Sequence, residues 1–373
     1  PLLFDVTGLV ALGNLGHRAM RVRNRKENRP PLHEARVTSS PRTEHLACQL
    51  LRQPPNGPDT EPTKTVASRS LFTSLCNHMP EHIPLRARER LTFQGDVPLA
   101  ARLSACREFL KFENAGLRTR HAAGAPGLTI VHQRAQVIDE LLRHLFDYAI
   151  RRYAEERGIV PTPVALVALG GYGRGELSPL SDIDVMFLFP TKTKPSEAKP
   201  LQEHLTNEIL YILWDCGLKV GHSTRTIDDA FVEARKDIQT KTALLEARLV
   251  TGAQKLFDTF SQAYRSYYTA EDPKGYIAAR LDDQASRRGK FAHTVFNQEP
   301  DIKNGVGGLR DYQNAVWMAR VRLDVTSIEE LAAQNYLHAD DLAAFRRSYD
   351  LLLRVDRKST RLNSSHTDIS RMP

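Results

Sequence analysis

A glycine-rich turn between two apolar runs of strand length sets narrow limits on the architecture of this chain. The first run, Pro163–Leu169, is continuously apolar and predicts a strand buried on both faces. The second run, Asp182–Phe189, ends at Pro190 and predicts a second strand. Two such strands joined by a short loop indicate a sheet at the centre of the fold.

Helical patterns surround these strands. Val131–Arg157 carries an apolar stripe at helical spacing, and Gly158 follows as a helix stop. Ser196–Asp215 predicts another helix, and Lys219–Thr226 a third, short strand. Every later element is predicted to be helical, over residues 228–236, 240–250, 254–269, 274–292, 309–323 and 339–356.

The chain divides into four predicted parts. Residues 1–78 are expected to be a disordered or non-native extension, because 8 of the 21 prolines lie within residues 1–70 and long stretches lack an apolar face. Residues 79–227 are expected to form an α/β domain with leading helices, and residues 228–357 an all-helical domain. The run 358–373 leaves the helical pattern and resembles translated adapter sequence, so we expect a non-native tail and a truncation near Arg357.

The net charge of +8 belongs to the two ends of the chain. Residues 1–70 hold 11 Lys and Arg against 6 Asp and Glu, and residues 358–373 hold 3 against 1. The body, residues 71–357, holds 38 against 37. A near-neutral body argues against a nucleic-acid partner, which a basic face would accompany.

Other sequence features exclude further classes of protein. No apolar run approaches the 18 or more residues that a membrane span needs, and no secretory signal is expected. The four cysteines lie far apart without a CxxC pair, which excludes a zinc ribbon and gives no disulfide framework. A reducing cytoplasm is the expected location. These cysteines are Cys48, Cys76, Cys106 and Cys216.

The turn itself carries Gly170, Gly171, Gly173 and Gly175. Glycine permits positive φ and lets backbone N–H groups approach a bound anion. The spacing fits neither the dinucleotide fingerprint nor a P-loop. Taken alone, the turn predicts an anion site and an ordinary tight turn about equally.

Two aspartates on the following strand, Asp182 and Asp184, favour a binding site over an ordinary tight turn. Residues two apart on a strand point to the same face, so both carboxylates emerge side by side. Two like charges this close repel unless a cation lies between them. Because Mg²⁺ is normally held by one or two carboxylates plus substrate phosphates, Asp182 and Asp184 are predicted to be catalytic metal ligands rather than loop caps.

These residues carry a family resemblance. A Gly-Gly turn followed by Ser-Asp-Ile-Asp resembles the nucleotidyltransferases of the DNA polymerase β type, and the run GGYGRGELSPLSDID at 170–184 resembles the branch that contains the bacterial PII-protein uridylyltransferase/uridylyl-removing enzymes. Residues 213–226 (LWDCGLKVGHSTRT) and 296–311 (FNQEPDIKNGVGGLRD) are similar to two further segments of that family. The resemblance spans residues 131–356.

The resemblance implies a fold, a reaction and a cofactor. The fold is an α/β (α+β) nucleotidyltransferase domain with a mixed sheet, followed by an all-helical domain. The reaction is Mg²⁺-dependent transfer of UMP from UTP to a tyrosine of the PII nitrogen-signalling protein, with release of pyrophosphate. The enzymes of this family continue into a uridylyl-removing His-Asp phosphohydrolase domain and glutamine-sensing ACT domains. The histidines of this chain show no H…HD…D pattern after the transferase region, so uridylyl removal is not expected of it.

Several side chains are candidates for binding the nucleotide. Arg174 in the glycine turn offers a planar fork for phosphate, with a solvated surface role as the alternative. Ser181 suits a turn cap or a phosphate contact equally, and Arg225 suits phosphate or an ion pair. The predicted nucleotide-binding set is therefore Gly170, Gly171, Gly173, Arg174, Ser181 and Arg225.

The remaining polar residues leave alternatives open. The third strand carries Lys219 and His222 but no acid, which puts a third metal ligand in doubt. Glu176 is interpreted as structural, and Glu246 as a helix-surface residue. In the segment 297–311, the charges form either a self-paired clasp between domains or a site from which Lys303 or Arg310 reaches the nucleotide.

Two rival functions remain at this point. One is a stand-alone nucleotidyltransferase with a different acceptor, and the other is a non-catalytic nucleotide-sensing module. Intact Asp182 and Asp184 favour an enzyme. No residue in the sequence predicts a preference for uracil.

Overall fold

The computed structural model describes residues 82–290 and 301–369. The disorder predicted for residues 1–78, the start of the 297–311 segment and the end of the 358–373 tail lie outside the described residues. No helix in the described ranges combines the length and the apolarity that crossing a bilayer requires.

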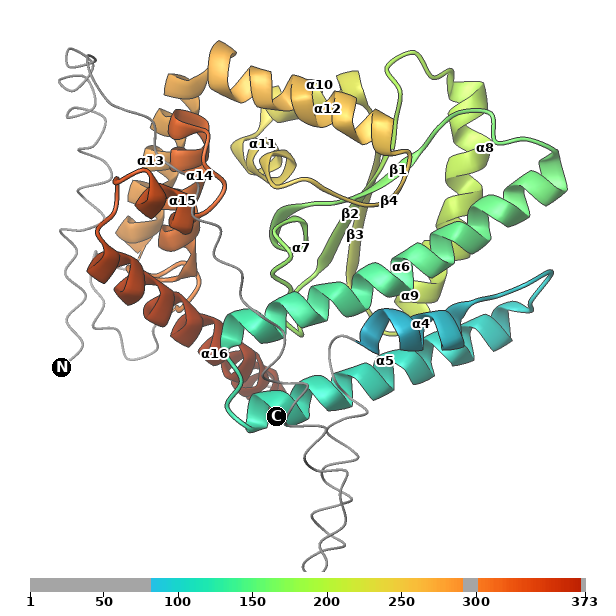
Figure 1. Cartoon of the computed structure of the whole chain (residues 1–373), viewed down its shortest axis with the longest axis horizontal. Helices are drawn as coiled ribbons and strands as arrows, with labels where there is room; N and C mark the ends of the chain where they lie inside the picture. The colour runs from blue at the N-terminus through green and yellow to red at the C-terminus, as the bar shows by residue number, and fades with distance from the viewer. Residues whose placement is uncertain (1–81, 291–300, 370–373) are drawn as a thin grey trace, which may run out of the picture. The chain divides into compact units, whose positions relative to one another are not determined.

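A four-stranded mixed sheet forms the centre of the described region (Figure 1). The strand order is β3-β2-β1-β4, with β2 parallel to β3 and β1 antiparallel to both β2 and β4. The predicted mixed α/β sheet followed by helices is thus confirmed. The strands are β1 (Ala165–Ala168), β2 (Ile183–Phe189), β3 (Val220–Thr226) and β4 (Arg248–Gly252).

The prediction of a helix over residues 240–250 is wrong at its second half. Helix α11 ends at Leu245, and Arg248–Gly252 forms β4 beside β1. The N–H of Ala253 donates to the Val164 carbonyl at 2.9 Å, which extends this pairing. A short apolar run fits helix and strand alike, and an open edge of β1 decides between them here.

One face of the sheet packs against the helices that lead into it and those that follow β2. Leu166, Val185 and Phe187 belong to this core together with Leu141 and Leu145 of the long central helix. The predicted helix 196–215 forms with a π-helical turn, Thr206–Leu210, in its middle. These helices are α4 (Ile83–Leu91), α5 (Leu99–Ala122), α6 (Gly127–Arg157), α8 (Pro195–Leu205) and α9 (Tyr211–Asp215).

The opposite face of the sheet packs against helices from the second half of the chain. Val167, Met186 and Leu188 lie in this core with Phe260 and Tyr264. The strand β4 and the helices that cover this face follow residue 227, where the sequence analysis places a domain boundary. That boundary stays a prediction. The helices are α10 (Ile227–Lys236), α11 (Ile238–Leu245), α12 (Gln254–Ser266), with the π-helical turn Tyr267–Glu271 after it, and α13 (Pro273–Lys290).

Three helices follow residue 300: α14 (Leu309–Leu323), α15 (Ile328–Ala333), which the sequence did not predict, and α16 (Ala339–Ile369). Helix α16 continues past residue 356, so the predicted end of the helical pattern before Lys358 is wrong. Its first half packs on α6, where a Cβ on Gly127 would lie 2.7 Å from the Asp350 carbonyl oxygen. Glycine at this position therefore allows the close approach of α6 and α16.

A substitution at Gly252 tests whether β4 lies as close to β1 as the structure shows. Its φ is +100°, and an added Cβ would lie 2.5 Å from the Val164 carbonyl oxygen. Gly158 has a similar φ of +88° with open space around it. We expect Gly158→Ala to lower the free energy of unfolding by about 1–2 kcal/mol through backbone strain, and Gly252→Ala by roughly 1–3 kcal/mol more through crowding. Urea unfolding measures both, and equal losses would contradict the close approach of β4 to β1.

Candidate active site

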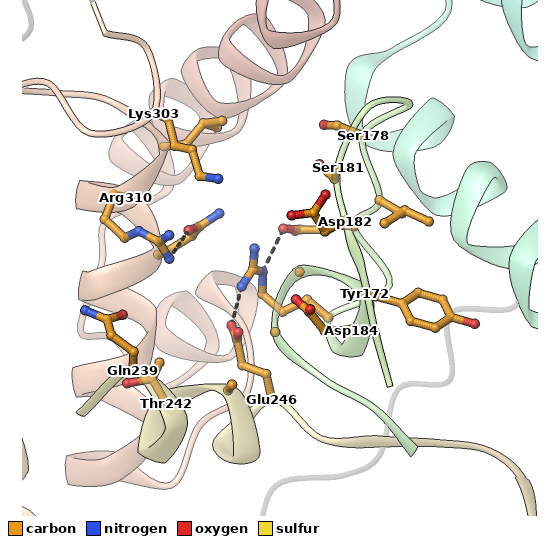
Figure 2. A pocket seen from close by; sticks show the side chains of 18 of the residues that line it. Tyr172, Ser178, Ser181, Asp182, Asp184, Gln239, Thr242, Glu246, Lys303 and Arg310 are labelled. Carbon is orange, nitrogen blue, oxygen red and sulfur yellow. Dashed lines mark hydrogen bonds and ion pairs between the residues drawn. The ribbon is translucent and has the colours of Figure 1, made fainter. Parts of the chain in front are cut away.

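A cavity of about 610 Å³ opens beside the glycine turn and the start of β2. One wall comes from helix α7 (Gly170–Gly173), the loop after it and β2. The facing wall comes from α11, the loop before α14 and α14 itself (Figure 2). We call this space the central cavity. Its polar lining includes Arg174, Ser181, Asp182, Asp184, Lys219, Gln239, Thr242, Glu246, Lys303, Arg310 and Gln313.

Asp182 and Asp184 are both exposed and line this cavity, as their spacing predicts. Asp184 lies opposite Gly221 of β3, where an added Cβ would be 2.5 Å from its Oδ1 atom. Gly170 has a φ of +55°, and its added Cβ would lie 3.8 Å from Oδ2. Glycines on two sides thus leave room for the Asp184 carboxylate and for what it binds.

The electrostatics of the two aspartates suit a cation. Partial burial and the negative charge of Asp182 raise the pKa of Asp184, and the positive charge of Lys303 opposes this rise. Among the described residues, neither carboxylate forms an ion pair. The pair therefore faces the cavity as two hard oxygen donors that no ion pair within the described residues occupies.

The glycines of the turn have two different roles. Gly170 and Gly171 line the cavity at the start of α7, where first-turn N–H groups have no acceptor within the helix. Gly173 is buried and absent from the cavity wall, and its added Cβ would lie 2.2 Å from the Glu246 carbonyl oxygen. The structure thus places two of the three predicted glycines at the site and gives Gly173 a packing role.

Arg174 lines the cavity, but its guanidinium is engaged by two acids. Its Nε donates to Glu176 at 2.9 Å and its Nη1 to Glu246 at 2.5 Å. Although burial alone lowers the pKa of Arg174, Glu246 and Glu176 raise it above its usual value. A phosphate contact by Arg174 stays a prediction, and the solvated surface alternative does not describe this largely buried ion pair.

The interpretation of Glu246 as a helix-surface residue is wrong. Glu246 is 6% exposed, directly after α11, and its carboxylate also accepts from the indole N–H of Trp317 on α14. Glu176 is structural, as interpreted, because it accepts from Arg174 and from the Tyr349 hydroxyl of α16 at 2.6 Å. Long-range partners decide the burial of both acids, which helical periodicity alone does not reveal.

The remaining polar residues discussed from the sequence differ in whether they line the cavity. Ser181 is exposed on the cavity wall, and its N–H donates to the Ser178 carbonyl in the turn before β2. Arg225 lies four residues along β3 from Gly221 and does not line the cavity. His222 is exposed, and its ring lies edge-on to Trp214 with centroids 5.7 Å apart. Nucleotide binding by Arg225 therefore stays a prediction without support from this geometry.

The described part of the 297–311 segment, with the first turn of α14, contains ion pairs and two cations that line the cavity. Asp311 pairs with Arg287 at 3.4 Å and Arg288 at 3.0 Å on α13, which forms a clasp. Lys303 and Arg310 line the central cavity and extend into it from the wall that faces the aspartates (Figure 2). Whether Lys303 or Arg310 reaches a nucleotide stays a prediction. Sequence reasoning missed several lining residues, whose helical spacing alone does not single them out from core positions. They are Gln239, Thr242, Gln313 and Trp317.

Comparison with known proteins agrees with this geometry. Residues 117–226 match the nucleotidyltransferase family model DUF294, and residues 275–364 match the family model described as GlnD PII-uridylyltransferase. The first match contains the glycine turn and the aspartate pair, and the second contains Lys303 and Arg310. The chain therefore contains a nucleotidyltransferase domain.

The curated relatives narrow this class. The chain is 33% identical over 265 residues to the bifunctional uridylyltransferase/uridylyl-removing enzyme of Azospirillum brasilense, a match that covers 69% of this chain and 27% of that enzyme. It is 34% identical to the enzymes of the same name from Rhodospirillum rubrum, over 61% of this chain and 24% of the relative, and Novosphingobium aromaticivorans, over 68% and 28%. The chain is thus a relative of the bifunctional uridylyltransferase/uridylyl-removing enzymes and spans about a quarter of their length.

The Arg174–Glu246 pair makes a testable contribution to stability. Glu246→Gln keeps a side-chain oxygen for the Trp317 indole but removes the charge that faces Arg174. We expect the free energy of unfolding to fall by on the order of 3 kcal/mol, because the buried guanidinium loses half of its compensation. Glu233→Gln, which breaks an exposed pair with Lys236 on α10, is the matched control and should change little. Equal, small effects in urea unfolding would show that the buried pair is not a stabilising link.

Proposed function

We propose that this chain is a Mg²⁺-dependent nucleotidyltransferase that moves UMP from UTP to a tyrosine hydroxyl of the PII signalling protein and releases pyrophosphate. The observation that carries the proposal is the pair Asp182 and Asp184, exposed together on a cavity wall beside a glycine turn. The names of the relatives and of the matching family support the choice of uridylyl group and of PII.

The residues at the cavity fit a magnesium ion. Two carboxylates without ion-pair partners in the described residues supply hard oxygen donors. Within the described residues, no group of three or more acidic, histidine or cysteine side chains is arranged to hold a metal. The two carboxylates of Asp182 and Asp184 are nevertheless enough for Mg²⁺, which usually takes one or two carboxylates and completes its shell with water and substrate phosphates.

When bound, the metal would supply charge neutralisation at the reacting phosphate. The chain's own residues would bind the nucleotide and orient its phosphates. Asp182 and Asp184 would hold the metal, and the N–H groups at Gly170 and Gly171 would contact the triphosphate. In the transfer, a bond forms between the tyrosine oxygen and the α-phosphorus, while the bond from that phosphorus to the bridging oxygen breaks. Its electron pair leaves with pyrophosphate, and the phenol proton passes to water.

The charge of the chain supports a protein acceptor over a nucleic acid. Residues 71–357 carry almost equal numbers of acidic and basic residues, whereas a polyanion substrate usually meets a basic face. Cytoplasmic location belongs to the same proposal.

The proposal is tested by incubating the full chain with α-labelled UTP, Mg²⁺ and PII protein. We expect label on PII that is lost when its acceptor tyrosine is replaced by phenylalanine. Label on a different acceptor would replace PII in the proposal, and nucleotide binding without any transfer would indicate a sensing module.

The aspartate pair gives the sharpest prediction on activity. Asp182→Asn and Asp184→Asn should each lower transfer by at least about 100-fold, because the metal's charge stabilisation depends on both ligands. Thermal stability without Mg²⁺ should hold or rise slightly, because neutralising one carboxylate relieves repulsion. The stabilisation that Mg²⁺ and UTP give the parent chain should vanish.

Asp282→Asn on the exposed side of α13 is the control and should retain parental transfer and ligand stabilisation. A well-folded Asp182→Asn protein that transfers at the parental rate would contradict the assignment of the metal site.

A further inference from the structure

The two walls of the central cavity carry different charges. The wall with α7 and β2 presents Asp182 and Asp184, and the facing wall presents Lys303 and Arg310 (Figure 2). Lys219, whose carbonyl accepts from the N–H of Ile183, is a further lining cation on the aspartate side. The other two acids of the lining, Glu176 and Glu246, are engaged by Arg174. Lys303 and Arg310 are therefore the cations of the facing wall that remain available to a ligand.

Arg310 is a partly buried guanidinium without a matching acid. Its Nη1 donates to the amide oxygen of Gln313 at 3.2 Å, and no carboxylate among the described residues forms an ion pair with it. Its charge centre lies 5.3 Å from the ring centre of Trp317, which Arg174 at 6.0 Å and Arg280 at 4.9 Å also approach. Burial and the charge of Arg174 lower the pKa of Arg310. A guanidinium crowded by others in this way favours a bound anion.

The loop that carries Lys303 holds it beside Arg310. The N–H of Arg310 donates to the Lys303 carbonyl at 2.8 Å, and the Lys303 N–H donates to the Asp301 carboxylate at 2.9 Å. Asp311 fixes the end of the loop, because it accepts from the Gly307 N–H at 3.1 Å and pairs with Arg288. The two cations are thus positioned together by backbone hydrogen bonds before any ligand arrives.

We propose that Lys303 and Arg310 bind the β- and γ-phosphates of the nucleotide and hold the leaving pyrophosphate. This inference rests on the proposed function, which places the metal and the α-phosphate at Asp182 and Asp184. The cations of the facing wall then remain for the distal phosphates, where negative charge accumulates as the bond to the α-phosphorus breaks. The phosphate site is completed by the segment after residue 300, outside the nucleotidyltransferase match at 117–226.

Equilibrium binding to the full chain tests this role without requiring transfer. Calorimetry with UTP, pyrophosphate and UMP, each with Mg²⁺, compares the parent with Arg310→Gln and Lys303→Gln. We expect each substitution to weaken UTP and pyrophosphate binding by about 10- to 100-fold, because each removes a hydrogen bond between charged groups. UMP binding should change less than about 3-fold, since UMP has no distal phosphates. Arg310→Lys should recover part of the loss.

Arg322→Gln, an exposed cation on the same helix α14, is the matched control and should leave all three affinities unchanged. Lys303 is exposed, so Lys303→Gln tests the site even if the Arg310 variant does not fold. Parental UTP and pyrophosphate affinity in a folded variant would overturn the inference, and so would equal weakening of UTP and UMP. Selective loss of UTP binding in a chain that labels no acceptor would uphold the phosphate site and refute the proposed transfer.

Discussion

The central cavity depends on the ion pairs that the largely buried guanidinium of Arg174 forms with two glutamates. The guanidinium joins the glycine turn, through Glu176, to the end of α11, through Glu246. Glu246 then accepts from Trp317 of α14, and Glu176 accepts from Tyr349 of α16. A buried charge is stable only when its partners are in place, so this network fixes the wall that follows residue 300 against the wall that carries the aspartates.

The charged residues around the cavity fall into a structural set and a set that faces the cavity. Arg174 and its two glutamates neutralise one another within the protein and hold the cavity together. Asp182 and Asp184 on one side, with Lys303 and Arg310 on the other, have no such partners among the described residues. A metal–triphosphate complex carries both signs of charge that these two sets require. Under the proposed function, these two sets of charges suit a nucleotide together with its metal.

The sequence predicts those parts of the fold and site that depend on local spacing. Alternation along β2 places Asp182 and Asp184 on one face, and the glycine turn follows a buried strand as predicted. The sequence pattern does not predict β4, because the pairing of Arg248–Gly252 with β1 depends on an edge about 80 residues earlier in the chain. The sequence pattern also does not predict that Glu246 is buried, because its partners, Arg174 and Trp317, lie about 70 residues away on either side. The ion pair of Arg174 with Glu246 is missed for the same reason.

A crystal structure of the full chain with Mn²⁺ and a non-hydrolysable UTP analogue tests the two-walled cavity most directly. The expected result is anomalous density for manganese between Asp182 and Asp184, with the distal phosphates within hydrogen-bond distance of Lys303 and Arg310. Manganese bound away from the two aspartates, or a triphosphate that extends into solvent without contacting the facing wall, would contradict the assignment.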